Sequence, residues 1–143
     1  MRVWRLCRAP YADLSGEGAR RFGGRWNVPG RPVVYAAADP ALTVLEVRVH
    51  LDLPLELLPD DYCLLSIETG PASCEQAPAT IQDNEHRRDF GERWLVEQRS
   101  ALLQVSSVIV PESYNVLINP LHPEANLIQI VSQRAFQFDE RLF

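Results

Sequence analysis

The 143-residue chain has few cysteines and no long apolar run. Its three cysteines, Cys7, Cys63 and Cys74, are an odd number at unpatterned spacings, which argues against a disulfide framework and favours a reducing cytoplasm. No apolar run approaches the roughly 20 residues that span a bilayer, and the first residues lack the apolar segment of a signal peptide. The sequence therefore predicts a cytoplasmic protein that does not enter a membrane.

The chain also lacks an excess of positive charge and the common motifs for metals and nucleotides. A formal charge of −5 and a pI near 5.2 argue against a dedicated nucleic-acid binder. The three histidines are far apart, and neither C-x-x-C nor H-E-x-x-H occurs, so we expect no metal site. A Walker loop, a G-x-G-x-x-G fingerprint and a G-x-S-x-G elbow are absent too, which excludes the commonest phosphate loops and the serine-hydrolase elbow.

What is present fits one ordinary globular domain spanning residues 1–143. The 46% apolar and 23% charged content can bury a core and keep it in solution. Short strands with only two good helices and no regular βαβ repeat predict an α+β domain with a mixed or antiparallel sheet and flanking helices. The expected strands are 1–8, 32–36, 62–68, 105–110, 116–118 and 127–131; the expected helices run from Asp39-Pro40 to before Pro54 and over 87–104; 15–31 and 70–80 are expected loops.

The loop at 15–31 holds five of the seven glycines and four arginines. Within it, Gly23 and Gly24 would let the backbone approach a ligand closely, and the planar guanidinium of Arg25 is suited to phosphate. Trp26 could wall a pocket. The same residues are also typical of a glycine turn with a solvated arginine and a core tryptophan, and the residues alone leave both interpretations open.

Glu46 is the most informative single residue. Helical spacing surrounds it with Leu42, Leu45 and Val49, and an unpaired carboxylate in an apolar stripe is costly. It therefore either pairs with an arginine of the glycine-rich loop or faces a substrate. Tyr35, in the apolar strand before this helix, fits a core position or a ligand wall.

Two further segments carry candidates with ordinary structural explanations. Ser106 and Ser107 begin a predicted strand, where adjacent side chains point to opposite faces, so at most one of them can face a given pocket. The run from Asn119 to Pro123 is typical of a turn, and His122 within it fits a turn residue better than a catalytic base.

Taken in order along residues 2–130, these motifs resemble the RES-domain toxin family, named for an arginine, a glutamate and a serine. The resemblance rests on five segments: Gly23-Gly24-Arg25-Trp26-Asn27, Val34-Tyr35-Ala36, Leu45-Glu46-Val47, Ser107 to Pro111, and Leu117 to Pro123.

The resemblance implies a split sheet like that of ADP-ribosyltransferases and consumption of NAD⁺. The implied reaction is glycohydrolysis, phosphorolysis with inorganic phosphate, or ADP-ribosylation of a protein. It also implies a partner, an Xre-like antitoxin that covers the active site.

By position, the resemblance assigns catalytic roles to Arg25, Tyr35, Glu46 and Ser107. Ser106 is the competing choice for the serine, because a one-residue slip selects the opposite strand face. The implied NAD⁺ contacts are Gly24, Arg25, Trp26, Tyr35 and Asn119.

The chemistry of the reaction agrees with these roles. Cleavage of the nicotinamide–ribose bond develops positive charge on the sugar, which a carboxylate such as Glu46 can stabilise. Arg25 suits the diphosphate, and Arg20, Arg21 and Arg31 could position a free phosphate.

Two other functions compete with this hypothesis. A non-catalytic module could dock an acidic partner on the arginine loop, whereas an RNA-cleaving toxin is disfavoured by the acidic balance and the lack of a histidine pair. We also expect an exposed apolar strand near Phe136 and Phe138 to suit a homodimer contact or an antitoxin seat.

Overall fold

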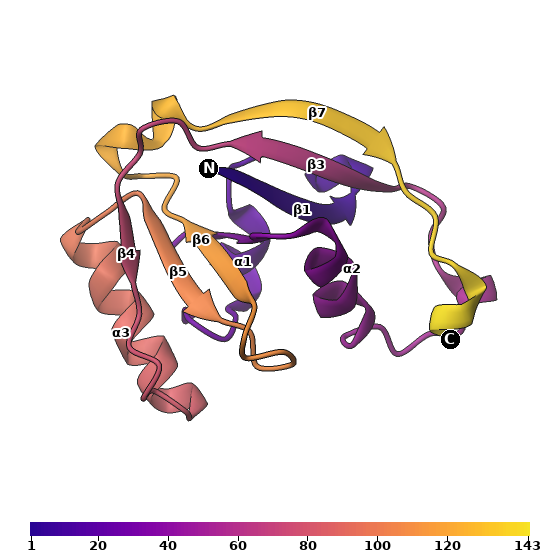
Figure 1. Cartoon of the computed structure of the whole chain (residues 1–143), viewed down its shortest axis with the longest axis horizontal. Coiled ribbons are helices and arrows are strands. Elements are labelled where there is room, and N and C mark those ends of the chain that lie inside the picture. The colour runs from indigo at the N-terminus through magenta and orange to yellow at the C-terminus, as the bar shows by residue number, and fades with distance from the viewer.

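The structure, a computed structural model that describes residues 1–143, contains seven strands and three α-helices (Figure 1). In chain order the elements are β1 (Arg2–Arg8), α1 (Glu17–Phe22), β2 (Val34–Ala37), α2 (Pro40–Arg48), β3 (Tyr62–Glu68), β4 (Cys74–Gln76), α3 (Asn84–Glu97), β5 (Leu102–Ser106), β6 (Tyr114–Ile118) and β7 (Gln129–Ala135).

All seven strands belong to one mixed sheet in the order β4-β5-β6-β2-β1-β3-β7. Every neighbouring pair is antiparallel except β4 and β5, which are parallel. The predicted α+β class with a mixed sheet and flanking helices is confirmed. No helix is long and apolar enough to cross a membrane.

The sheet is nearly divided between β1 and β2. These strands share a single register pair, Trp4 with Ala37, whereas β1 and β3 pair along seven residues. Figure 1 shows β5 and β6 running in a different direction from β1, β3 and β7, with α2 beside the junction. The hydroxyl of Thr43 on α2 donates to the carbonyl oxygen of Trp4 at 3.2 Å, so the helix supplies a contact where the strands part. Strand pairing is therefore weakest beside α2.

Two apolar clusters form the core. The larger contains Leu65 and Ile67 of β3 together with residues of β1, β2, β5 and β6, so it spans both halves of the sheet. The other joins α3 to the sheet through Trp94 and Leu103. Neighbouring residues of β5 point into different clusters, because side chains alternate along a strand. The strands β5 and β6 are thus buried on both faces.

The segment 15–31 is not wholly irregular, as the sequence suggested, because it contains α1. Gly16 and Gly23 bracket this short helix with φ values of 72° and 73°, in the left-handed region that glycine adopts freely. A Cβ on Gly16 would also lie 2.6 Å from the backbone nitrogen of Val33. The glycines here start and stop a helix.

The bounds predicted for the second helix, 87–104, were wrong at both ends. α3 begins earlier because Asp83 caps it, accepting from the His86 N–H at 2.9 Å, and it ends at Gln98 with φ 50°. The apolar residues after it form β5, so the strand expected over 105–110 lies several residues too late. The expected loop 70–80 contains the short β4, and β7 starts two residues later than expected and runs to Ala135.

The aromatic residues of the tail were expected on an exposed apolar strand, but they pack on their own chain. Phe138 makes edge contacts with Phe136, Tyr62 and Phe143, at centroid distances of 5.1, 5.2 and 6.0 Å. Phe143 in turn lies under the guanidinium of Arg48 at 4.0 Å. Phe136 and Phe138 are half-buried, while the edge strand β7 before them is mostly exposed and carries Val131 on its surface.

Candidate functional site

A cavity of about 660 Å³ lies beside the junction of the two sheet halves. Its wall is built from β1, β2, β5, β6, α2, the first turns of α3 and the loop around α1. The volume is within the ~300–1,000 Å³ typical of small-molecule sites. The charged side chains that line it are one carboxylate and three guanidinium groups: Glu46, Arg5, Arg25 and Arg88.

Glu46 faces this cavity from α2 and is held by two uncharged donors. The Ser107 hydroxyl and the Asn115 amide donate to its Oε1 at 2.7 and 2.8 Å. Both donors use the same oxygen, so Oε2 has no partner in the protein. The sequence left two alternatives for Glu46, an ion pair with an arginine or a position facing a ligand. No arginine pairs with Glu46, and the residue lines the cavity. The apolar stripe expected around Glu46 is not continuous, because Val49 is 49% exposed. The carboxylate is held by polar donors.

The two adjacent serines have different contacts. Ser107 is buried directly after β5, and its hydroxyl accepts from the backbone N–H groups of Ile109 and Val110 while donating to Glu46. Ser106, the last residue of β5, lines the cavity, whereas Ser107 is not among the lining residues. Ser107 therefore positions the carboxylate and fixes the turn after β5, while Ser106 forms part of the wall.

Tyr35 anchors the glycine-rich loop from β2. Its hydroxyl donates to Asn27 Oδ1 at 2.7 Å and accepts from the Trp26 N–H at 3.0 Å. Burial raises the pKa of Tyr35, so the hydroxyl stays protonated at neutral pH. A Cβ on Gly24 would lie 2.7 Å from that hydroxyl oxygen. Gly24 is thus required by the tyrosine contact, and the Tyr35 ring remains available to line the cavity.

Arg25 and Trp26 both line the cavity, but they differ in burial. Arg25 is half-buried, has no carboxylate partner, and donates from Nη1 to Asn84 Oδ1 at 3.1 Å. Trp26 is only 6% exposed and packs edge-on against Phe90 at 6.2 Å, so most of its surface belongs to the core. The loop combines both earlier interpretations: a core tryptophan beside an arginine that faces a pocket.

The other arginines of this loop do not reach the cavity. Arg20 pairs with Glu17 and Arg31 with Glu92, while Arg21 is exposed. None of the three is among the lining residues, so the structure does not place them as the holders of a free phosphate.

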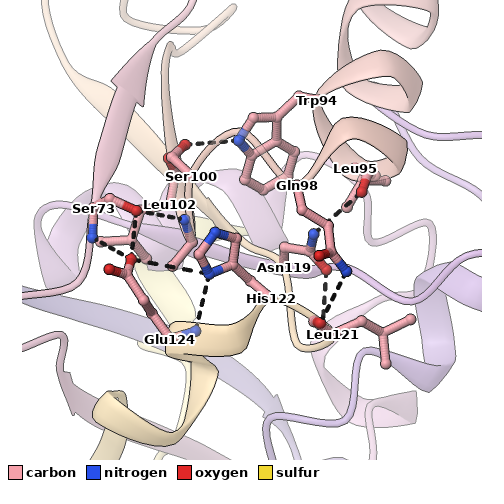
Figure 2. A network of polar contacts seen from close by, with 11 residues as sticks. Ser73, Trp94, Leu95, Gln98, Ser100, Leu102, Asn119, Leu121, His122 and Glu124 are labelled. Atoms are coloured by element: carbon pink, nitrogen blue, oxygen red, sulfur yellow. Dashed lines mark hydrogen bonds and ion pairs between the residues drawn. The ribbon is translucent and has the colours of Figure 1, made fainter.

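Asn119 lies in a separate polar network around the end of α3, shown in Figure 2. Its amide donates to the Leu95 carbonyl at 3.4 Å, and its Oδ1 accepts from the Leu121 N–H at 3.0 Å. The residue is 2% exposed and does not line the cavity. His122, in the same network, accepts from the Glu124 N–H and serves the turn. The structure gives Asn119 a structural contact rather than a place at the site.

Sequence reasoning missed several cavity residues: Arg5, His50, Asn84, Arg88 and Asn115. His50 carried a usable signal, because in the expected helix, which was to run until before Pro54, it follows Glu46 by four residues on the same face. In the structure α2 ends at Arg48, and His50 lies in the turn after it. The other four come from distant elements that only the fold brings together. The described residues include no group of three or more His, Cys, Asp or Glu side chains that could hold a metal ion.

Comparison with known proteins identifies the family of this α+β domain. A profile of the RES domain matches residues 2–139, and the chain belongs to the RES domain family. Its resemblance to this family, inferred from the ordered motifs, is confirmed.

Similar curated proteins are named as toxins. One from Pseudomonas putida, "Toxin Res", is 42% identical over 149 residues and covers both chains fully. "Prs ADP-ribosylating toxin" from a Sphingobium species is 43% identical over 143 residues, covering 91% of this chain and 86% of the relative. "NAD(+) phosphorylase MbcT" from Mycobacterium tuberculosis is 56% identical over 36 residues, covering 24% of this chain and 19% of its own.

One solved structure has the same fold. The crystal structure of the M. tuberculosis MbcT-MbcA toxin-antitoxin complex matches with a TM-score of 0.73 at 19% identity, covering 95% of this chain and 84% of the matched chain.

Proposed function

We propose that this protein is the toxin of a toxin–antitoxin system and that it cleaves NAD⁺ at the nicotinamide–ribose bond. The observation that carries the proposal is Glu46, whose Oε1 is fixed by Ser107 and Asn115 while Oε2 is left free in a cavity of about 660 Å³. The names of the relatives support the same chemistry, since two of them act on NAD⁺ or transfer ADP-ribose by name.

Glu46 suits the bond that must break. When the bond between the anomeric carbon and the nicotinamide nitrogen breaks, its electron pair goes to the ring nitrogen and the sugar carbon becomes cationic. The nicotinamide leaves as a neutral molecule, so no general acid is needed. A prepositioned carboxylate oxygen stabilises the sugar cation and can accept a hydrogen bond from a ribose hydroxyl. Oε2 is the oxygen available for this role.

The remainder of the cavity suits the remainder of the dinucleotide. Three arginines against one glutamate make the cavity cationic inside a chain of net charge −5. Such a cavity attracts the anionic diphosphate, and Arg25 offers a planar donor pair for it. Tyr35, Trp26 and Gly24 form the wall beside Arg25, where an aromatic face can contact a planar ring.

The acceptor of the ADP-ribosyl group distinguishes three versions of the reaction. Purified protein should be incubated with NAD⁺, with and without inorganic phosphate, and the products weighed by mass spectrometry. Water gives ADP-ribose, phosphate gives phosphorylated ADP-ribose, and a protein acceptor gains the mass of ADP-ribose. We expect release of nicotinamide in every version. Its absence at high enzyme concentration would overturn the enzymatic proposal in favour of a protein-binding module.

We further propose that an Xre-like antitoxin neutralises the protein in the cytoplasm by covering the cavity. Exposed apolar side chains stand next to residues of the wall: Phe22 is 83% exposed beside Gly23, and Val108, itself a lining residue, is 47% exposed. Apolar groups at a cavity mouth suit a protein that seals it. The matching toxin–antitoxin complex supports an antitoxin partner for this fold.

Replacing Ser107 with alanine tests how the carboxylate is positioned. The variant removes one of the two donors to Glu46, and a hydrogen bond to a charged group contributes ~1.5 kcal/mol or more. We therefore expect kcat for NAD⁺ cleavage to fall about tenfold with little change in KM.

The melting temperature of the variant should be measured beside its kinetics, because Ser107 also accepts from two backbone N–H groups and its loss could destabilise the fold. Ser132→Ala, at an exposed position of β7, is the matched control and should change neither kcat nor melting. Unchanged kcat in Ser107→Ala would show that Asn115 alone suffices to hold Glu46.

A further inference from the structure

Arg88 differs from the other arginines of the chain in its surroundings. The chain has 14 arginines and no lysine. Only Arg21, Arg88 and Arg93 make neither a side-chain hydrogen bond nor an ion pair, and Arg21 and Arg93 are exposed to water. Arg88 is half-buried and lines the cavity. It is therefore a permanently charged group, partly removed from water, with no counter-charge.

The carboxylate best placed to neutralise Arg88 is already used. Glu92 lies one turn further along α3, but its Oε1 accepts from the Val28 N–H at 3.0 Å and its Oε2 lies 3.9 Å from Arg31. No buried side-chain nitrogen or oxygen lacks a partner. The unpaired guanidinium nitrogens of Arg88 are therefore accessible, and the residue lines the cavity, so an anion bound there could reach them.

A second cation stands on the same wall. Asn84, one turn before Arg88 on α3, accepts from Arg25 at 3.1 Å and from Arg87 at 3.0 Å. Residues four apart on a helix are neighbours on one face, and both Asn84 and Arg88 line the cavity. Arg25 and Arg88 therefore flank Asn84. The third lining arginine, Arg5, is engaged by the carbonyls of the chain at Tyr11 and Asp13.

We propose that Arg88 binds the diphosphate of the dinucleotide together with Arg25, an inference that rests on the proposed function. A diphosphate presents two anionic groups, and two guanidinium forks can each take one in a paired hydrogen-bond geometry. Glu46, the only carboxylate of the cavity, is left to the ribose. The assignment makes α3 part of the substrate site and not only a cover for the sheet.

The test measures binding directly, with ADP, adenosine and inorganic phosphate as probes in calorimetric titrations. Arg88→Ala should raise the Kd for ADP about tenfold and leave the Kd for adenosine unchanged, because adenosine carries no phosphate. Arg93→Ala removes an exposed, unpaired arginine from the same helix and is the matched control; it should leave both affinities unchanged.

Three results would overturn the assignment. Wild-type protein could fail to bind ADP, Arg88→Ala could bind ADP as tightly as wild type, or Arg93→Ala could weaken binding equally, which would indicate a general charge effect. Loss of inorganic phosphate binding with intact ADP binding would assign Arg88 to a free phosphate instead and so also overturn it. Binding of ADP does not depend on turnover, so failure of NAD⁺ cleavage and failure of this assignment remain distinguishable.

Discussion

Replacing Glu46 with glutamine is expected to lower kcat for NAD⁺ cleavage by about 10²–10³-fold, the range seen when a prepositioned electrostatic group is removed. Glutamine keeps an oxygen that can accept from Ser107 and Asn115, so the side chain should stay in place. The free Oε2, however, becomes an uncharged NH₂ that cannot stabilise a cationic sugar. Nicotinamide release under single-turnover conditions measures this loss, because it isolates the bond-breaking step.

Two comparisons make the Glu46 result decisive. Glu56→Gln removes one negative charge at an exposed position outside the cavity and should retain full activity. Melting temperature and circular dichroism of Glu46→Gln should match wild type, since both hydrogen bonds to the side chain can persist. Full activity in Glu46→Gln would remove this residue from the mechanism, and an unfolded variant would show that the charge itself supports the fold.

Replacing Gly91 with alanine is expected to destabilise the protein by about 3 kcal/mol, at the upper end of what overpacking costs. A Cβ at this buried position of α3 would lie 1.8 Å from the carbonyl oxygen of Trp26 and 2.8 Å from its carbonyl carbon. Both contacts are with backbone, which cannot rotate away as a side chain can. Either α3 or the loop at Trp26 must therefore move, and both carry residues of the cavity. Urea unfolding followed by tryptophan fluorescence measures the loss.

Gly18→Ala is the matched control for this experiment. Gly18 lies inside α1 with nothing within 4 Å of a built Cβ, and alanine favours a helix over glycine by up to ~1 kcal/mol. The control should be neutral or slightly stabilising. A Gly91→Ala variant as stable as wild type would mean that α3 can shift from Trp26 at little cost.

How well each element could be predicted depended on how its side chains are buried. β3 was predicted with correct bounds because buried and half-buried residues alternate along it from Tyr62 to Glu68. β5 was absorbed into a predicted helix because Leu102 and Leu103 are buried on opposite faces, which removes the alternation. The first three residues of α3 were missed because its cap, Asp83, lies in a polar stretch without an apolar signal.

The residues of the site also differ in how far the sequence could predict them. Arg25, Tyr35 and Glu46 came from local motifs, and the fold places all three in the wall of one cavity. Asn115 and Arg88 could not be inferred, because nothing in their neighbourhood in sequence shows that β6 and α3 converge on α2. Asn119 belonged to a motif of the family resemblance, yet its side chain hydrogen-bonds to Leu95 of α3 and Leu121 of its own turn and does not line the cavity.

The single register pair between Trp4 and Ala37 has a mechanical consequence. Elsewhere in the sheet, moving two strands apart would break a ladder of backbone hydrogen bonds, each contributing ~1 kcal/mol. At this joint the ladder contributes little, and the two halves are joined instead by the apolar cluster in which Val3 and Leu65 pack with Val34 and Val116. Cohesion between the two halves therefore comes from side-chain packing and not from strand pairing.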